Sequence, residues 1–266
     1  MKILQNKYKM YQLISHSISK TYTRLLRKKK LASLVDVERS EYTFYINYLR
    51  PGMIVFDVGA HVGEISLLLT RFTSFQGIVH AFEASSSTFS KLTKLCKLTG
   101  RNNIILNHKL VADKKEIMKL YIYDEVHSGW NTLAKRPLHN YGYNVKPISI
   151  ENIEAITIDE YCKENNISQI DLLKIDVEGA EYQVLLGARH MLENQKVSCC
   201  IFEFGTTTFD MGNTPSDIEI YLKQFGYKIR NIVEGNPVFP GRSNAKFARF
   251  SVHIAWHPKV ACINFK

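Results

Sequence analysis

The sequence predicts an α/β protein built on one mainly parallel sheet with helices on both faces. From residue 53 onward, short apolar segments typical of buried strands alternate with longer amphipathic segments of helical spacing. Strands that are joined by helical crossovers run parallel, and such a sheet needs helices on both sides. With 266 residues, 45% of them hydrophobic, the chain is long enough for one large core, and it contains no internal repeat.

The N-terminal part of the chain is strongly basic. Residues 1–40 contain ten Lys/Arg and two Asp/Glu, a balance of +8, whereas the remaining residues contain 25 and 23, a balance of +2. Apolar residues at three- and four-residue spacings over 4–31 predict one or two amphipathic helices, with a polar face that ends in RKKK at 27–30. We therefore predict a basic helical extension over residues 1–39. It packs on the domain or on a second subunit of a homodimer, or it contacts a membrane surface or an acidic partner. The nearly neutral remainder argues against a nucleic-acid partner.

The second predicted unit is a single domain over residues 40–266. A helix over 40–49 ends before the breaker Pro51-Gly52. Strands are then predicted at 53–59, 77–84, 103–113, 117–124, 170–176 and 197–204, with late β segments at 227–233 and 247–256. Helices are predicted at 64–72, 87–100, 157–166, 180–192 and 215–226. A loop-rich insertion over 124–147 is expected to overhang the active-site rim.

Cysteine usage and hydropathy bear on the compartment. The five cysteines form no CxxC pair, which argues against a zinc ribbon or a disulfide framework and favours a reducing, cytoplasmic location. The chain has no apolar run of about 18 residues and no signal-peptide core, so we expect neither a membrane span nor a secretory signal.

An acidic residue stands at the end of each of five predicted strands: Asp57, Glu83, Asp113, Asp176 and Glu203. In an open α/β sheet, ligands bind beyond the carboxyl ends of the strands. Taken singly, each acid could be a turn residue or a helix-start acid. Together they predict a ligand site with carboxylates along its rim.

The first strand–helix loop indicates which ligand binds there. Gly59 and Gly63 let the backbone approach a ligand, but their G-x-x-x-G spacing is neither the dinucleotide fingerprint nor a Walker motif. Asp57 suits a ligand that carries an ammonium group, Glu83 can accept hydrogen bonds from ribose hydroxyls, and Asp113 is placed to meet an exocyclic amine such as that of adenine. An amino acid, a ribose and an adenine together describe S-adenosylmethionine.

Several segments resemble the FkbM family of S-adenosylmethionine-dependent methyltransferases: VFDVGAHVGEISLLL, VHAFEAS, LVAD, TIDEYC, IDLLKIDVEGAEYQVLLGA and IFEFG. The resemblance covers roughly residues 40 to 205. It implies a Rossmann-like class I methyltransferase fold with a seven-stranded sheet, and O-methylation of a hydroxyl on a sugar or secondary metabolite. His61 departs from the family, which usually has Asn there. The predicted cofactor-binding residues are Asp57, Gly59, Ala60, His61, Gly63, Glu83, Ala84, Ala112, Asp113 and Asp176.

The predicted catalytic residues are Asp176, Glu178 and His127. Asp176 ends a strand that this topology places beside the first, where it could orient the acceptor hydroxyl or take its proton. It could also hold Mg²⁺ or another divalent cation together with Glu203. Glu178 could act there or serve as a helix-dipole partner, and His127, in the insertion, could be a base near neutral pH or a surface residue.

The acceptor is expected to be a small molecule, a carbohydrate or a peptide. Two alternatives to O-methylation stay open at this point. One is N- or carboxyl-methylation of a peptide natural product, and the other is a peripheral membrane or adaptor protein with a degenerate cofactor pocket.

Overall fold

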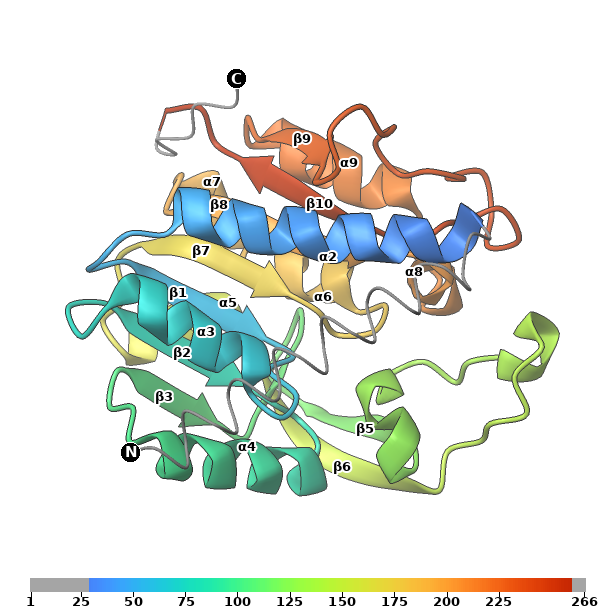
Figure 1. The fold of residues 1–266 in the computed structure, drawn as a ribbon, viewed down its shortest axis with the longest axis horizontal. Helices are drawn as coiled ribbons and strands as arrows, with labels where there is room; N and C mark the ends of the chain where they lie inside the picture. Colours follow the sequence, from blue (N-terminus) through green and yellow to red (C-terminus); the bar gives the residue numbers. More distant parts are fainter. Residues whose placement is uncertain (1–28, 260–266) are drawn as a thin grey trace, which may run out of the picture.

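The computed structural model describes residues 29–259, with side chains from residue 34, and it confirms the α/β class (Figure 1). Seven strands form the main sheet. In spatial order they are β3 (Ile104–Asn107), β2 (Ile78–Phe82), β1 (Ile54–Val58), β7 (Ile170–Ile175), β8 (Val197–Phe204), β10 (Ser251–Trp256) and β9 (Lys228–Asn231). The strands from β3 to β8 are parallel, and β10 lies antiparallel between β8 and β9.

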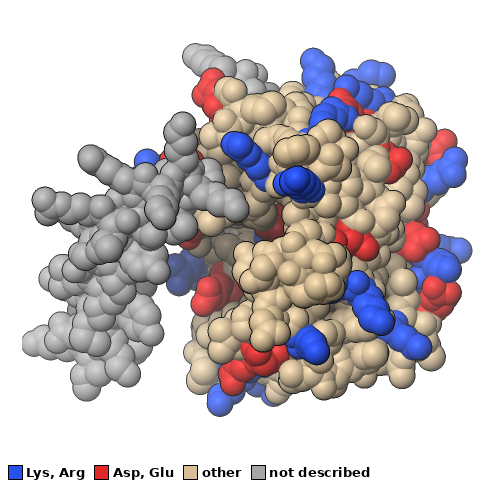
Figure 2. All heavy atoms as spheres, turned by 90° about the vertical axis from the view of Figure 1, so that its right-hand side faces the viewer, with Lys and Arg blue, Asp and Glu red and all other residues tan. Residues whose placement is uncertain are grey.

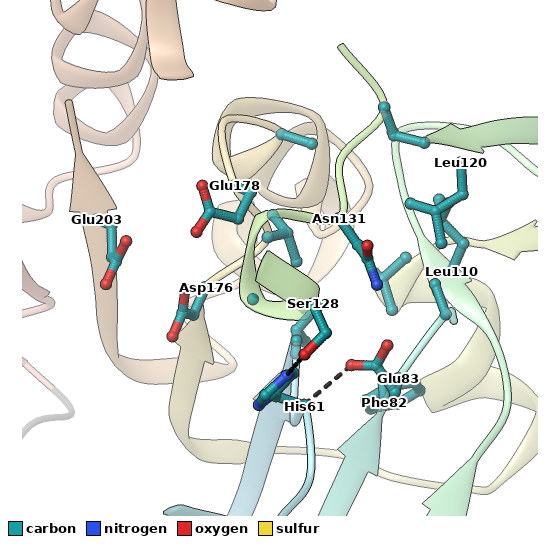
Figure 3. A pocket seen from close by; sticks show the side chains of 18 of the residues that line it. His61, Phe82, Glu83, Leu110, Leu120, Ser128, Asn131, Asp176, Glu178 and Glu203 are labelled. Carbon is teal, nitrogen blue, oxygen red and sulfur yellow. Dashed lines mark hydrogen bonds between the residues drawn. The ribbon is translucent and has the colours of Figure 1, made fainter. Parts of the chain in front are cut away.

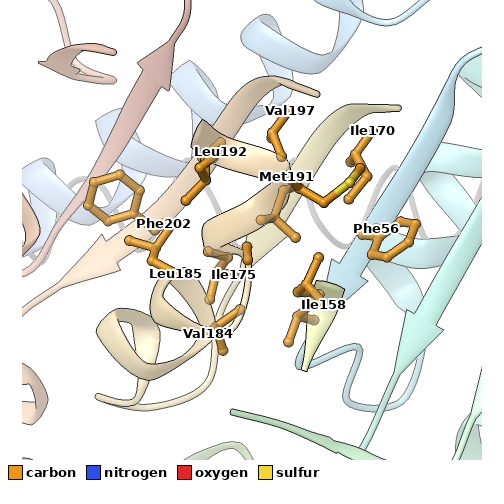
Figure 4. Packing of buried hydrophobic residues seen from close by; sticks show 14 of the residues in the cluster. Phe56, Ile158, Ile170, Ile175, Val184, Leu185, Met191, Leu192, Val197 and Phe202 are labelled. Carbon is orange, nitrogen blue, oxygen red and sulfur yellow. The ribbon is translucent and has the colours of Figure 1, made fainter. Parts of the chain in front are cut away.

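Helices cover both faces of this sheet, because its strands are apolar on both sides. In Figure 1, α2 (Lys29–Tyr48) and α3 (Glu64–Thr73) lie in front of the sheet, and α4 (Ser86–Thr99) flanks β2 and β3. Behind it lie α5 (Ile158–Glu164), α6 (Glu181–Leu186), α7 (Arg189–Glu193) and α9 (Pro215–Gln224). Along β7, Leu172 packs in the α2 and α3 layer and Leu173 in the opposite layer, as strand alternation requires. Figure 4 shows part of the core in this opposite layer, around Ile170 and Ile175.

The beginning of the described chain differs from the expected pattern. The helix predicted over 40–49 is the second half of α2, which runs unbroken from Lys29 to Tyr48. The predicted boundary at residue 39 therefore falls inside a helix. Most of the amphipathic stretch predicted over 4–31 lies outside the described residues.

A second, three-stranded sheet interrupts the alternation after β3. It contains β4 (Leu110–Val111), β6 (Ser149–Ile156) and β5 (Ile117–Ile122), in that order. The strand predicted over 103–113 is thus two strands in two sheets, and β6 was not predicted. The insertion carries two short 3-10 helices, η1 (Glu125–Trp130) and η2 (Leu138–Tyr141).

Two further details of the helices differ. The helix predicted over 180–192 is split into α6 and α7 at Gly187, where a Cβ would lie 2.0 Å from the carbonyl oxygen of Ala112. A short helix, α8 (Thr206–Asp210), follows β8. Cys96, Cys162, Cys199 and Cys200 are free and buried. Among the helices of residues 29–259, none has the length and apolar character needed to cross a membrane.

Candidate functional site

A cavity of about 350 Å³ opens where the carboxyl ends of β1, β2, β7 and β8 meet the small sheet and η1 (Figure 3). This volume lies in the range of about 300–1,000 Å³ that is typical of small-ligand sites. Seven predicted site residues line it: Gly59, His61, Glu83, Ala84, Asp176, Glu178 and Glu203. Figure 2 faces this side of the molecule and shows Lys/Arg and Asp/Glu dispersed over the described part of the surface.

The turn after β1 is shaped by its glycines. Gly59 has φ +85°, and a Cβ there would lie 1.8 Å from the carbonyl oxygen of Asp176, so the turn fits against the end of β7 only without a side chain. The backbone N–H groups of Gly59 and Ala60 donate to the carbonyl of Phe82 at 3.0 and 2.8 Å. Gly63 precedes α3 with φ +94°, and a Cβ there would meet Leu92 at 2.4 Å. Ala60 and Gly63 therefore support the turn but do not line the cavity.

His61 has a backbone conformation that explains its departure from the family. Its φ is +49°, in the left-handed region where Asn and His are both enriched among non-glycine residues, so His can replace Asn without changing the turn. Its Nε2 lies 3.1 Å from the Oγ of Ser128 in η1, and the two atoms can share a hydrogen bond. Burial lowers the pKa of His61 below its ordinary value. The residue thus links the β1 turn to the insertion.

Glu83 stands one residue beyond β2 and is only 8% exposed. Its two carboxylate oxygens accept hydrogen bonds from the N–H groups of His61 and Ser85, both at 2.9 Å. Burial raises the pKa of Glu83 to about 7, and these hydrogen bonds offset only part of that effect. A carboxylate can accept about four hydrogen bonds, so Glu83 retains acceptor capacity toward the cavity.

Beyond Glu83 the cavity wall is mostly apolar and suits an aromatic base. It is formed by Phe82, Leu110, Val111, Leu120 and Leu133.

The position of Asp113 differs from the predicted one. Asp113 is exposed and does not line the cavity, and Ala112 is fully buried beside Gly187. The reason is that the chain leaves the main sheet after Asn107, so Asp113 follows β4 of the small sheet.

Asp57 also departs from its predicted role. It is fully buried, accepts a hydrogen bond from Ser66 Oγ at 2.5 Å and pairs with Lys174 Nζ at 3.1 Å. The same Nζ lies 3.2 Å from Asp176. Burial alone would lower the pKa of Lys174, but the charges of Asp57, Asp176 and Glu41 outweigh it and raise that pKa. Asp57 is therefore held in an internal ion pair and does not line the cavity.

Sequence reasoning missed Lys174, although a signal for it existed. It is the one charged residue inside the apolar run LLKI, and it is 4% exposed. Buried lysines are rare unless they are paired, so its place in the strand points to an acidic neighbour.

The turn between β7 and α6 presents Glu178 to the cavity. Glu178 has φ +54°, and Gly179, with φ +107°, could not carry a Cβ because it would lie 2.4 Å from the carbonyl oxygen of Thr207. The buried carboxylate of Glu181 accepts from the N–H groups of Val177 and Gly179 at 3.3 and 3.1 Å, and burial raises its pKa to about 7. Glu181 therefore holds the turn in shape.

Glu178 is tied to the insertion through a residue that was not predicted. Arg136 Nη1 lies 3.4 Å from Glu178, and its Nε lies 3.3 Å from Asp210 of α8. Tyr141 donates to Asp210 at 2.5 Å. Burial, together with the charge of Asp176, raises the pKa of Glu178 to about 8. Within the sequence nothing distinguishes Arg136 from other charged loop residues, so only the fold reveals this contact.

His127 does not reach the cavity, although its neighbours Ser128 and Gly129 do. Its Nδ1 lies 2.8 Å from Asp124, and its ring lies 4.7 Å from that of Trp130. These contacts anchor η1, so the predicted catalytic role of His127 finds no support in its position.

The predicted metal site has too few ligand side chains. Asp176 and Glu203 both line the cavity, but residues 29–259 contain no group of three or more His, Cys, Asp or Glu side chains that could hold an ion. Lys174 already pairs with Asp176. Burial and the charges of Asp176 and Glu178 raise the pKa of Glu203 well above its ordinary value.

Comparisons with known proteins complete the description of the site. Residues 57–229, about two thirds of the chain, match the family described as the Methyltransferase FkbM domain. The 31-O-demethyl-FK506 methyltransferase FkbM of Streptomyces tacrolimicus is 26% identical over 217 residues, which cover 73% of this chain and 78% of that protein.

Two solved structures are also similar. One is the methyltransferase FkbM from Methylobacillus flagellatus KT, with 15% identity and a TM-score of 0.47. The match covers 80% of this chain but spans only 50% of that one. The other is an S-adenosylmethionine-dependent O-methyltransferase from Thermotoga maritima, with 11% identity and a TM-score of 0.45, covering 86% of this chain and 67% of that one.

Proposed function

Because this chain belongs to the FkbM family of S-adenosylmethionine-dependent methyltransferases, we propose that it methylates a hydroxyl oxygen of a sugar or secondary metabolite. The relative from Streptomyces tacrolimicus supports oxygen as the receiving atom, since its name places its reaction at a 31-O position. When bound, S-adenosylmethionine supplies an electrophilic methyl group.

The observation that carries this proposal is the arrangement of Glu83 beside the Gly59 turn. The turn brings backbone to the cavity without side-chain bulk, and Glu83 offers carboxylate oxygens for the two ribose hydroxyls. The apolar wall from Phe82 to Leu133 would receive the adenine ring. Asp57 is held by Lys174 and does not line the cavity. Asp176, at the end of β7 beside β1, does line it and can meet the ammonium group of the cofactor.

The acceptor would occupy the other part of the cavity, toward β8. Asp176, Glu178, Glu203 and Phe250 line this part. None of these four residues is cationic, so they offer no charged partner to a phosphorylated or carboxylated acceptor. Neutral polyols or hydroxylated polyketides fit it better, since their hydroxyls can donate to these carboxylates.

A two-step experiment tests the proposal. Calorimetry first measures S-adenosylmethionine binding, and a mass-spectrometric screen of sugars, polyketides and peptides then looks for a gain of 14 Da with fragmentation to locate the methyl group. We expect binding and an O-methylated product.

Each other outcome identifies a different function. A methyl group on a peptide nitrogen or carboxylate would replace the proposal with the peptide alternative. Cofactor binding without transfer to any acceptor would favour an adaptor with a retained pocket, and the absence of binding at millimolar cofactor would refute both enzyme functions.

A further inference from the structure

Three carboxyl groups line the acceptor part of the cavity, and two of them have a basic partner. Asp176 pairs with Lys174 at 3.2 Å, and Glu178 pairs with Arg136 at 3.4 Å. Glu203 differs, because no ion pair or hydrogen bond engages its carboxyl group among the described side chains. In Figure 3 it projects from the end of β8 toward Asp176.

The register of the sheet places Glu203 beside Asp176. Ile175 of β7 is paired with Phe202 of β8. Asp176 is the next residue after Ile175, and Glu203 is the next residue after Phe202. Both side chains therefore leave neighbouring strands at the same level of the cavity. A hydroxyl group bound between them would lie within reach of both.

We propose that Glu203 is the general base of the methyl transfer, a role that rests on the proposed O-methyltransferase function. An alkyl hydroxyl is a poor nucleophile at neutral pH and gains from a base that removes its proton in the transition state. As the new O–C bond forms, the C–S bond of the sulfonium breaks and its electron pair stays on sulfur. The hydroxyl proton passes to the Glu203 carboxylate and later leaves to solvent.

The neighbouring groups are less suited to this step. The carboxyl groups of Asp176 and Glu178 are already engaged by Lys174 and Arg136, whereas that of Glu203 has no such contact among the described side chains. Burial and the charges of Asp176, Glu178 and Glu181 raise the pKa of Glu203, and the charge of Lys174 offsets only part of this effect. Asp176 would then serve the ammonium group of the cofactor, and His127 is anchored elsewhere.

The test replaces Glu203 by Gln, which keeps the volume of the side chain but cannot take a proton. With an acceptor from the screen, E203Q should lower kcat by roughly 10²- to 10⁴-fold. Affinity for S-adenosylmethionine should stay within about threefold, since the proposed contacts of Glu83 with the ribose and of the apolar wall with the adenine are unchanged. E203D keeps a base at a longer reach and should recover part of the rate. E193Q, at an exposed position on α7, is the matched control.

Two readouts separate a base from a merely structural residue. The wild-type rate should rise with pH through a group above the ordinary glutamate range, because the base must be ionised, and E203Q should lose this rise. The deficit of E203Q should also shrink with phenolic acceptors, since they ionise more easily than alkyl alcohols and need less help from a base.

The outcomes distinguish this inference from the function on which it rests. A folded E203Q that keeps more than a third of the rate and the same pH profile would overturn the base role and leave the O-methyltransferase function standing. An equal deficit for alkyl and phenolic acceptors would also overturn it. A wild-type protein that transfers no methyl group to any acceptor would refute the proposed function, and the base role with it.

Discussion

Replacing Lys174 by Met should destabilise the protein strongly, because one ammonium group neutralises two carboxylates at the end of the sheet. Lys174 is 4% exposed, and its Nζ lies 3.1 Å from Asp57 and 3.2 Å from Asp176. Met fills a similar volume but carries no charge. The variant would leave Asp57, which is fully buried, with only the hydroxyl of Ser66 as its partner.

The size of the effect follows from burial. Removing one partner of a buried ion pair typically costs about 3–5 kcal/mol, because it leaves a desolvated charge behind. Asp176 adds little to this cost, since its side chain is 37% exposed and can be hydrated. For a chain of this length, 1 kcal/mol lowers Tm by roughly 2–4 °C, so we expect a loss of about 6–20 °C. The pKa of Lys174 is raised, so its contribution is complete below about pH 10.5 and is lost only as the pH rises further.

Thermal and urea unfolding at pH 7 to 9 would measure this effect, and the loss should be constant over that range. The double variant K174M/D57N should recover much of the stability, since Asn keeps the hydrogen bond from Ser66 without a charge. K196M, at an exposed position, should change the free energy of unfolding by less than about 0.5 kcal/mol. If K174M unfolds like the wild type, Asp57 has another means of neutralisation and our account of the ion pair is wrong.

Three further predictions concern cofactor binding. E83A should weaken S-adenosylmethionine binding about ten- to a hundredfold in calorimetry, because a charged hydrogen bond is worth roughly 1.5–3 kcal/mol. Wild-type affinity should rise through about pH 7, where Glu83 ionises, and a flat profile would remove Glu83 from the site. G59A should lower the affinity at least tenfold, because its Cβ would lie 1.8 Å from the Asp176 carbonyl. G100A, with a positive φ but nothing within 4 Å, should bind normally, and equal effects of the two would contradict the packing argument. Removal of residues 1–28 should leave the affinity unchanged, since the cavity is lined by residues 58 to 250, and lost binding in a folded protein would show that this segment completes the site.

Much of the fold could be predicted from local patterns. The alternation of apolar strands and amphipathic helices is a property of short windows, so β1, β2, β7 and β8 were located correctly. The resemblance to the family placed the strand predicted over 170–176 beside the first, and β7 does pair with β1. The same reasoning predicted acids at the carboxyl ends of the strands, and three of them, Glu83, Asp176 and Glu203, do line the cavity.

The small sheet could not be predicted, for two physical reasons. β6 is largely exposed along its first half, so its sequence lacks the apolar period that marks a buried strand. The break between β3 and β4 depends on which sheet each segment joins, a choice made by contacts far away in the sequence. The contacts of Lys174 with Asp57 and of Arg136 with Glu178 could not be predicted for the same reason, because these residues come together only in the folded chain.

Four of the five acids differ in outcome according to where each one stands relative to the last paired residue of its strand. Asp57 lies inside β1 and is paired on both sides, with Ala81 and with Lys174, so strand alternation turns its side chain into the α2 and α3 layer. Glu83 and Asp176 each come one residue after a strand ends, where the chain is free to turn toward the cavity.

Glu203 is the intermediate case. It belongs to β8 and is paired with Val252 of β10, but the pairing with β7 ends one residue earlier, at Phe202. On the side toward β7, Glu203 therefore has no paired strand residue and lies next to Asp176. Its carboxyl group points into the cavity even though the residue belongs to a strand. An acid reaches the rim of such a sheet when at least one neighbouring strand has already ended. Counting residues from the predicted strand end cannot show this, because it depends on how far the neighbour extends. The same condition leaves Glu203 beside the acceptor space without a basic partner among the described side chains, which is why we assign the proton transfer to it and not to Asp57 or Asp176.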